Sequence, residues 1–272
     1  MSFLPSIFRR TCAALAVAAA VASSFAAGWE ETVPPYAPGN FPEMRAARAQ
    51  YGFGWNGGTV ATAQLHFHRV DDQLVLEGSA ETVGFARGLL QFAVQHYSAA
   101  DARTLRPIRV KEVENRRSKQ FDTEATYTAD QVSAHRIEQK DGKTKTSDRA
   151  FEFPNVMSLN SALLYLRSKP LEQGSVERIV VFPARSPYLC TLTVLGREHV
   201  NVPAGSYDAI KLDVKLSKIA DDHTLKPHKK FKRATVWISN DSDRLLLRIE
   251  GQIFLGNVFA ELQSVQFESA KP

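Results

Sequence analysis

The chain has 272 residues, of which 44% are hydrophobic, and its 34 lysines and arginines exceed its 29 aspartates and glutamates to give a formal charge of +5. A chain of this length can bury most of its apolar surface in one core and needs no disulfide bonds to fold. Its mild positive charge suits an anionic partner of the cell envelope, but it lacks the concentrated basic stripe of a nucleic-acid-binding protein, so we expect no nucleic acid partner.

The N-terminus has the pattern of a secretory signal peptide. Arg9 and Arg10 form a charged segment, residues 13–21 are an unbroken run of small apolar side chains, and small residues stand at positions 24 and 26, which a signal peptidase recognises. We therefore expect residues 1–26 to be a signal peptide, and we expect the mature chain to begin near Ala27 in the periplasm.

Two other membrane attachments are not expected. Cys12 lies inside the apolar run rather than at its end, where a lipoprotein cysteine stands, so we expect no lipid anchor. No later segment approaches the roughly 18 consecutive apolar residues that a spanning helix needs. Removal of the leader leaves Cys190 as the single cysteine, which excludes an internal disulfide.

Residues 27–49 are predicted to form a proline-containing N-terminal arm, because Pro34, Pro35 and Pro38 occur there without any periodicity. Residues 50–267 are predicted to form one β-rich domain, followed by a short tail at residues 268–272. In this domain, apolar and polar residues alternate with the period of two that is typical of β-strands. The alternating runs cover residues 59–70, 74–80, 108–115, 121–128, 131–139, 144–153, 176–182, 189–200, 207–219, 231–239, 245–250 and 252–267.

This pattern predicts a mainly β fold. About a dozen strands follow one another without the helices of parallel β-α-β units, so the sheet should be antiparallel and strongly curved. We expect a single curved antiparallel sheet or half-barrel, with one or two short helices packed on it.

Residues 158–169 are predicted to form one of these helices. Ser158 can cap its N-terminus and Pro170 ends it, while Leu159, Leu163 and Leu166 would share one face.

Residues 84–92 form an apolar segment interrupted by Gly84 and Gly88. One interpretation is a short core helix or bent strand. The other is a mobile lid over a ligand, in which Phe85, Leu89 and Phe92 supply the apolar contact surface, because each glycine costs a helix about 1 kcal/mol.

Four motifs resemble a known protein family. They are residues 203–212, 161–167, 97–107 and 237–245, and their order and spacing are similar to those of domain of unknown function 3108 over about residues 50–263. The helix usually begins with Asp in that family where this chain has Ser158, and Pro often stands where this chain has Leu246. The resemblance implies an exported, β-rich, barrel-like domain, similar to envelope lipid carriers, with no established activity.

The motif residues also have a structural interpretation. A turn between two strands needs the fixed φ of proline followed by a glycine, and the cluster after Trp237 is typical of a strand end and a polar turn. An Arg244–Asp241 contact would hold that turn together, or would form half of a binding site. We interpret the following motif residues as structural: Pro203, Gly205, Tyr207, Trp237, Ser239, Asp241 and Arg244.

The chain contains no recognisable nucleophile motif, and Cys190 lies in an apolar alternation typical of an inert core residue. We therefore expect no catalytic residues and no enzymatic activity. His66 and His68 are two residues apart on a predicted strand, a spacing with which two imidazoles can bind one ion. The other five histidines show no matching spacing, so we expect no metal and no cofactor.

The segment 226–233 carries five cations: Lys226, Lys229, Lys230, Lys232 and Arg233. It is either a solvated hairpin loop or a docking patch for an anionic membrane surface.

Three classes of function remain open. The sequence favours a non-catalytic periplasmic carrier that binds an apolar or amphipathic envelope molecule; the alternatives are an envelope assembly module that binds protein or glycan, and a hydrolase without a recognisable motif. A carrier should enclose a large apolar cavity, whereas an assembly module should have a filled core and an exposed apolar patch.

Overall fold

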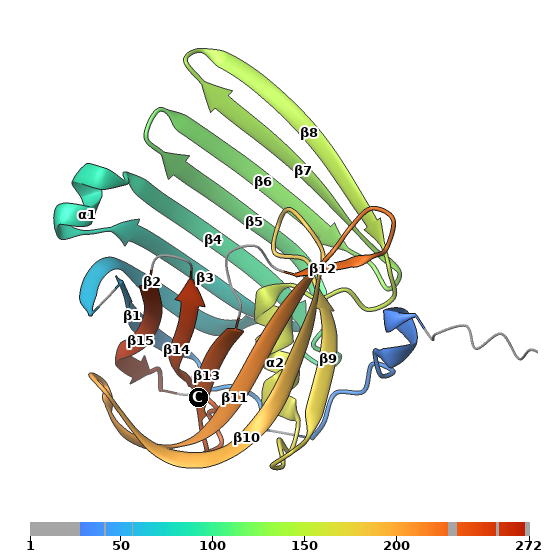
Figure 1. Cartoon of the computed structure of the whole chain (residues 1–272), viewed down its shortest axis with the longest axis vertical. Helices are drawn as coiled ribbons and strands as arrows, with labels where there is room; N and C mark the ends of the chain where they lie inside the picture. Colours follow the sequence, from blue (N-terminus) through green and yellow to red (C-terminus); the bar gives the residue numbers. More distant parts are fainter. Residues whose placement is uncertain (1–27, 41, 56, 228–232, 254–255, 270–272) are drawn as a thin grey trace, which may run out of the picture.

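A computed structural model of the chain describes residues 28–40, 42–55, 57–227, 233–253 and 256–269. Its main feature is one large antiparallel sheet that curves without closing into a barrel (Figure 1). The strands follow the order β8-β7-β6-β5-β4-β3-β2-β1-β15-β14-β13-β11-β10-β9, and the short β12 pairs with β11. The predicted fold class is confirmed.

The elements have the following bounds. The first half of the sheet consists of β1 (Ala47–Trp55), β2 (Gly58–Val70), β3 (Gln73–Thr82), β4 (Phe92–Asp101), β5 (Pro107–Arg116), β6 (Lys119–Tyr127), β7 (Gln131–Lys140) and β8 (Lys143–Glu152). The second half consists of β9 (Val176–Val181), β10 (Tyr188–Val202), β11 (Gly205–Ile219), β12 (Leu225–Pro227), β13 (Arg233–Ser239), β14 (Leu246–Ile253) and β15 (Gly256–Phe267). The described helices are η1 (Trp29–Thr32), α1 (Gly84–Leu89) and α2 (Leu159–Ser168).

Three strands were absent from the sequence prediction: β1, β4 and the short β12. β1 begins at Ala47, inside the segment predicted as an arm, and β4 begins at Phe92, inside the segment predicted as a helix or lid. Gly52 and Gly54 obscure the alternation of β1. The glycine at position 54 has a structural reason, because a Cβ there would collide with the ring of Phe259 on the adjacent strand β15.

Alternation in β1 defines the two faces of the sheet. Ala47, Ala49 and Tyr51 are buried, and Ala49 and Tyr51 belong to a hydrophobic cluster with residues of β10, β11 and β13 to β15. Arg48 and Gln50 alternate with them and therefore lie on the opposite side, which we call the outer face. The outer face carries most of the polar side chains considered below.

Helix α2 lies within the curve of the sheet rather than on its surface (Figure 1). The Ser158 hydroxyl accepts a hydrogen bond from the Ser161 backbone at 3.1 Å, which confirms the predicted N-cap. The predicted single apolar face is wrong, because Leu159 is exposed while Leu164 and Tyr165 are buried. The sequence pattern failed here because the helix is enclosed by the sheet and the N-terminal arm, so its burial extends around most of its circumference.

The N-terminal arm packs along α2 and the neighbouring strands. The ring of Tyr36 stacks on that of Tyr165 with centroids 5.2 Å apart, and Trp29 stacks on Phe153 at 5.3 Å. The backbone of Gly39 donates a hydrogen bond to the Ser168 hydroxyl at 2.9 Å. These contacts hold the arm against α2 and against Phe153, which follows β8.

Strands β10 and β11 form a long curved hairpin (Figure 1). Its turn comprises Pro203 and Ala204, and Gly205 has a φ of +137°, a conformation that favours glycine. The Ala204 backbone donates a hydrogen bond to the carbonyl of Leu262 in β15, so the hairpin tip rests on a strand that is not its neighbour in the sheet order.

No helix among the described residues has the length and apolar character needed to cross a membrane. The predicted signal peptide, residues 1–26, lies outside the described residues.

Candidate functional site

The predicted lid residues lie at one end of the strands. Helix α1 connects β3 to β4, and of its residues only Ala86 is buried. The side chains of Phe85 and Leu89 are 67% and 66% exposed, so the interpretation of this segment as core is wrong for them. Phe92 is half-buried at the start of β4.

Two further apolar side chains are exposed at the same end of the sheet. Leu90 is 50% exposed, directly after α1, and Trp55 is 41% exposed at the end of β1. Helix α1 contacts β2, which follows the β1–β2 turn, and the Val83 backbone donates a hydrogen bond to the Val60 carbonyl. We call Trp55, Phe85, Leu89 and Leu90 the apolar rim.

Cationic side chains flank the apolar rim. The guanidinium of Arg117, in the β5–β6 turn, donates to the carbonyl of Leu89 at 2.7 Å, and Arg116 lies over the ring of Phe92. Arg87 on α1 forms an ion pair with Glu81 at 2.6 Å. Figure 1 shows α1 at the same edge as the β5–β6 and β7–β8 turns. The strand ends that flank these turns carry Lys119, Lys140 and Lys143.

The predicted basic docking patch is only partly described. Lys226 is exposed in β12, and Arg233 forms an ion pair with the buried Asp213. Lys229, Lys230 and Lys232 lie outside the described residues. The structure thus gives Arg233 a partner within the sheet.

The outer face carries a groove of about 640 Å³, and residues of β15 and β1 to β5 line it. The strand register places five uncharged polar side chains in one row across it: Ser264, Gln50, Gln64, Ser79 and Gln95. A second groove of about 290 Å³ shares Gln64, Ser79 and Gln95 and extends towards the α1 end. Neither groove is lined by α1, so α1 does not cover these grooves.

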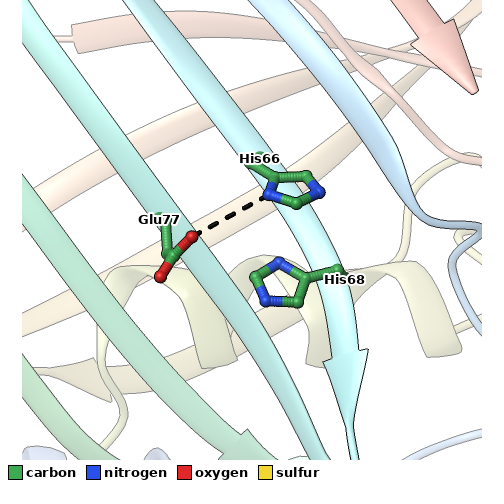
Figure 2. Close-up of side chains that lie close together, drawn as sticks. All are labelled: His66, His68 and Glu77. Atoms are coloured by element: carbon green, nitrogen blue, oxygen red, sulfur yellow. Dashed lines mark ion pairs between the residues drawn. The ribbon is translucent and has the colours of Figure 1, made fainter. Parts of the chain in front are cut away.

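His66 lines the larger groove, and the ring of His68 stacks beside that of His66 (Figure 2). They project from the same face of β2, with ring centroids 4.2 Å apart, and Glu77 on β3 is directly opposite His66. The Nδ1 atom of His66 is 3.8 Å from the Glu77 carboxylate, and its Nε2 atom is 2.8 Å from Oε1 of Glu268. The sequence analysis considered the two histidines and missed both carboxylates, which only the strand pairing brings to them.

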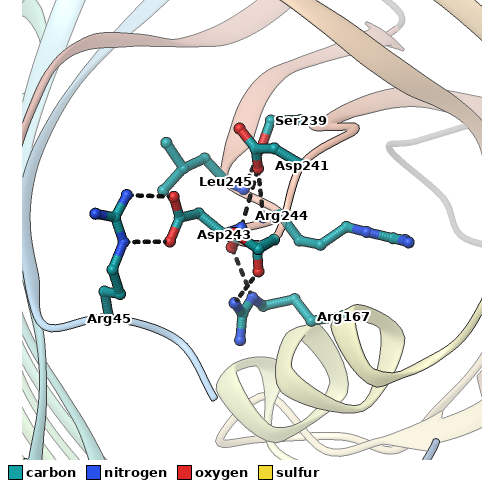
Figure 3. Close-up of polar contacts among 8 residues, drawn as sticks. Arg45, Arg167, Ser239, Asp241, Asp243, Arg244 and Leu245 are labelled. Carbon is teal, nitrogen blue, oxygen red and sulfur yellow. Dashed lines mark hydrogen bonds and ion pairs between the residues drawn. The ribbon is translucent and has the colours of Figure 1, made fainter. Parts of the chain in front are cut away.

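The residues of the polar turn after β13 belong to a partly buried network (Figure 3). The Asp241 carboxylate accepts hydrogen bonds from the Ser239 hydroxyl and from the backbones of Asp243 and Arg244. The Ser239 hydroxyl accepts one from the Leu245 backbone at 2.8 Å. Asp241 therefore holds the turn through the backbone of Arg244.

Asp243 connects this turn to two distant segments. Its carboxylate forms a bidentate pair with Arg45, which precedes β1, at 2.8 and 2.5 Å. Its carbonyl accepts a hydrogen bond from Arg167 of α2 at 2.8 Å, and the carbonyl of Ser242 accepts a second from the same guanidinium. Burial lowers the pKa of Arg167 to about 10. The sequence analysis placed Asp243 only in the polar turn, did not name Arg45, and did not connect Arg167 with the turn.

Two further motif residues, Trp237 on β13 and Tyr207 on β11, contact the hydrophobic core. Trp237 is buried, and its indole donates to the Glu198 carboxylate at 2.6 Å, which helps to hold the pKa of Glu198 below its usual value. Tyr207 packs partly buried against the hydrophobic cluster that contains Trp237.

Cys190 is buried on β10, and desolvation raises the pKa of its thiol to about 12. A thiol with this pKa is protonated near neutral pH and is a poor nucleophile.

Residues 48–263 match the protein family described as "Protein of unknown function (DUF3108)". The chain belongs to this family. The predicted resemblance is thereby confirmed, and the match covers the sheet from β1 to most of β15. A comparison with curated proteins finds no match.

Among solved structures, the chain is similar to a β-barrel-like protein of domain of unknown function DUF1849 from Brucella abortus. The TM-score is 0.59 at 10% sequence identity, covering 84% of this chain and 100% of that one. This likeness supports the barrel-like fold alone.

Two further similarities have lower TM-scores. A putative exported protein with a YmcC-like fold from Bacteroides fragilis gives 0.34 at 6% identity, covering 85% of this chain and 100% of that one. A putative lipoprotein from Parabacteroides distasonis gives 0.33 at 8% identity, covering 84% of this chain and 99% of that one.

Proposed function

We propose that this DUF3108 protein is an exported, non-catalytic envelope protein that binds amphipathic lipid at an anionic membrane surface through its apolar rim. The observation that carries the proposal is the exposure of Trp55, Phe85, Leu89 and Leu90 at one end of the sheet, beside arginines. Export rests on the predicted signal peptide, and the absence of catalysis is supported by the buried, protonated Cys190.

The packing of the core favours the rim over an internal cavity as the lipid site. The inner face of the sheet and α2 are covered by hydrophobic clusters. The groove of about 640 Å³ and the smaller groove beside it are open and lie on the outer face, with polar row residues in their lining. A filled core with an exposed apolar patch is the arrangement of a protein that binds at its surface.

The charge at this end of the strands suits an anionic surface. Arg117 and Lys143 have no carboxylate within ion-pair distance among the described residues, so both can reach a lipid phosphate. The turns at the opposite ends of these strands carry charges of both signs, Asp71, Asp72 and Asp130 together with Arg103 and Arg106. The apolar rim and the cations beside it would orient the protein with its α1 end towards the membrane.

The expected affinity is moderate. Burying a side chain of the size of Phe or Leu contributes about 1.5–3 kcal/mol, and each cation near an anionic membrane contributes about 1 kcal/mol. Phe85, Leu89 and Leu90 together with two cations therefore give roughly 6.5–11 kcal/mol before the cost of association, which is itself at least about 4 kcal/mol. Binding should be reversible and should weaken with salt.

The test is sedimentation of the protein with vesicles of phosphatidylglycerol and phosphatidylethanolamine, compared with vesicles of phosphatidylcholine. We expect binding to the anionic vesicles, reduced at least about tenfold by the double variant Phe85→Ser/Leu89→Ser, since two buried side chains are lost. The matched control is Val70→Ser/Val176→Ser, which removes two exposed apolar side chains away from the rim.

Equal loss of binding in the rim variant and the control variant would overturn the proposal, as would wild-type protein that ignores anionic vesicles. Failure to bind vesicles, together with rim-dependent binding to another envelope protein, would establish the assembly alternative instead. Circular dichroism of each variant reports whether the sheet is intact.

A second candidate function rests on the outer face. The row Ser264, Gln50, Gln64, Ser79 and Gln95 presents hydroxyl and amide groups that none of the described side chains engages in hydrogen bonds. Such groups can donate to and accept from the hydroxyls of a glycan. Binding of envelope glycan fragments that is lost in Gln64→Ala/Gln95→Ala but retained in the rim variant would favour this function.

A further inference from the structure

We infer that His66, His68 and Glu77 form a binding site for a zinc ion on the outer face of the β2–β3 hairpin. Each of the three residues can direct one ligand atom, an imidazole nitrogen or a carboxylate oxygen, so that the three atoms lie within 4.8 Å of one another. Figure 2 shows the two rings on β2 and the carboxylate on β3 facing a common point. This site is separate from the apolar rim and does not depend on its function.

The strand geometry explains why these residues converge. Residues two apart on a strand project from the same face, which places His66 beside His68. The antiparallel register then sets Glu77 directly opposite His66. Directly opposite side chains on one face have Cβ atoms about 4.5–5.5 Å apart, close enough to share an ion. No loop conformation is needed to assemble the site.

The distances suit zinc after small side-chain rotations. Two ligands of one tetrahedral zinc ion, each bound at about 2.0–2.1 Å, lie about 3.3 Å apart. The 3.8 Å between His66 Nδ1 and the Glu77 carboxylate is near this separation. Two imidazoles and one carboxylate are a donor set that zinc accepts, and they leave a fourth position for water. That position opens on the groove lined by His66 and Glu77.

His68 provides an independent sign of a ligand. Its Nδ1 atom is buried and has no hydrogen-bond partner among the described residues. A buried polar atom without a partner costs about 1–3 kcal/mol, and coordination to a metal would satisfy this nitrogen.

Glu268 completes the site as a positioning residue. Its Oε1 atom lies 2.8 Å from Nε2 of His66, an ion-pair contact outside hydrogen-bond geometry that a small rotation would convert into a hydrogen bond. A histidine that binds metal through one nitrogen usually donates its other N–H to such a carboxylate. Arg48 holds Glu268 at 3.1 Å and so fixes the carboxylate beside His66.

The experiment is calorimetric titration of metal-free, tag-free protein with zinc chloride. We expect one zinc ion per chain. Affinity should fall by about a hundredfold or more in His66→Ala and His68→Ala, and by about 10–100-fold in Glu268→Gln, as is usual for such supporting carboxylates. Glu77→Gln should also weaken binding by at least about tenfold. Cobalt substitution should give the intense visible absorption of a tetrahedral site, with loss of that band in His68→Ala.

The matched control is His135→Ala. His135 also lies on an exposed strand face, 2.6 Å from the carboxylate of Asp148 on the next strand, but outside this three-residue cluster. Its removal should leave zinc affinity unchanged. Glu77 is exposed, so Glu77→Gln should fold normally, and melting in chelator checks this. Absence of stoichiometric zinc binding by the wild type, or equal losses in His135→Ala and His68→Ala, would overturn the inference.

Discussion

Replacement of Arg167 by methionine tests whether the family motifs meet in a buried structural network. Arg167 is 3% exposed on α2, and its guanidinium donates to the carbonyls of Asp243 and Ser242. Methionine keeps much of the side-chain volume but leaves both carbonyls without their donor. Each hydrogen bond from a charged group contributes about 1.5–3 kcal/mol, so the two together give about 3–6 kcal/mol.

Part of this stabilisation is offset, because burying the guanidinium carries a desolvation cost that also lowers its pKa. We therefore expect Arg167→Met to reduce the free energy of unfolding by about 2–4 kcal/mol. At roughly 2–4 °C per kcal/mol for a domain of this size, the melting temperature should fall by about 4–16 °C.

The assay is urea denaturation followed by circular dichroism, with Arg87→Met as the control. Arg87 is an exposed arginine with one ion pair, and its replacement should change stability by less than about 1 kcal/mol. A loss below about 0.5 kcal/mol in Arg167→Met would refute the assignment of a structural role to this network, because that change is no larger than the effect of a typical surface substitution.

Three further predictions concern single positions. Ser158→Ala should destabilise the protein by about 0.5–2 kcal/mol in the same denaturation assay, because the Ser161 backbone loses its cap; Ser158→Asp, which keeps an acceptor, should lose less. Gly54→Ala should lower the melting temperature while Gly88→Ala does not, because only at position 54 does the added Cβ meet the Phe259 ring. Cys190 should resist a thiol reagent at pH 8 in the folded protein and react in urea; because burial raises its pKa to about 12, its contribution to stability is fully present below about pH 9 and declines as the pH rises towards 12.

The sequence by itself determined the fold class, because alternation along a strand requires no knowledge of which strand lies beside it. It also determined the helix cap at Ser158 and the turn at Gly205, since both depend on local backbone chemistry. The strand β4 escaped detection because Phe92, its first residue, continues the apolar run of α1.

Tertiary structure alone decided the surroundings of each candidate site. Glu77 and Glu268 reach His66 through strand register and the end of β15, a pairing that spans most of the chain. Arg45, Arg167 and Asp243 likewise meet across about 200 residues. The exposure of Phe85 and Leu89 also depended on the fold, because an apolar segment does not reveal from its sequence whether other elements of the folded chain cover its side chains.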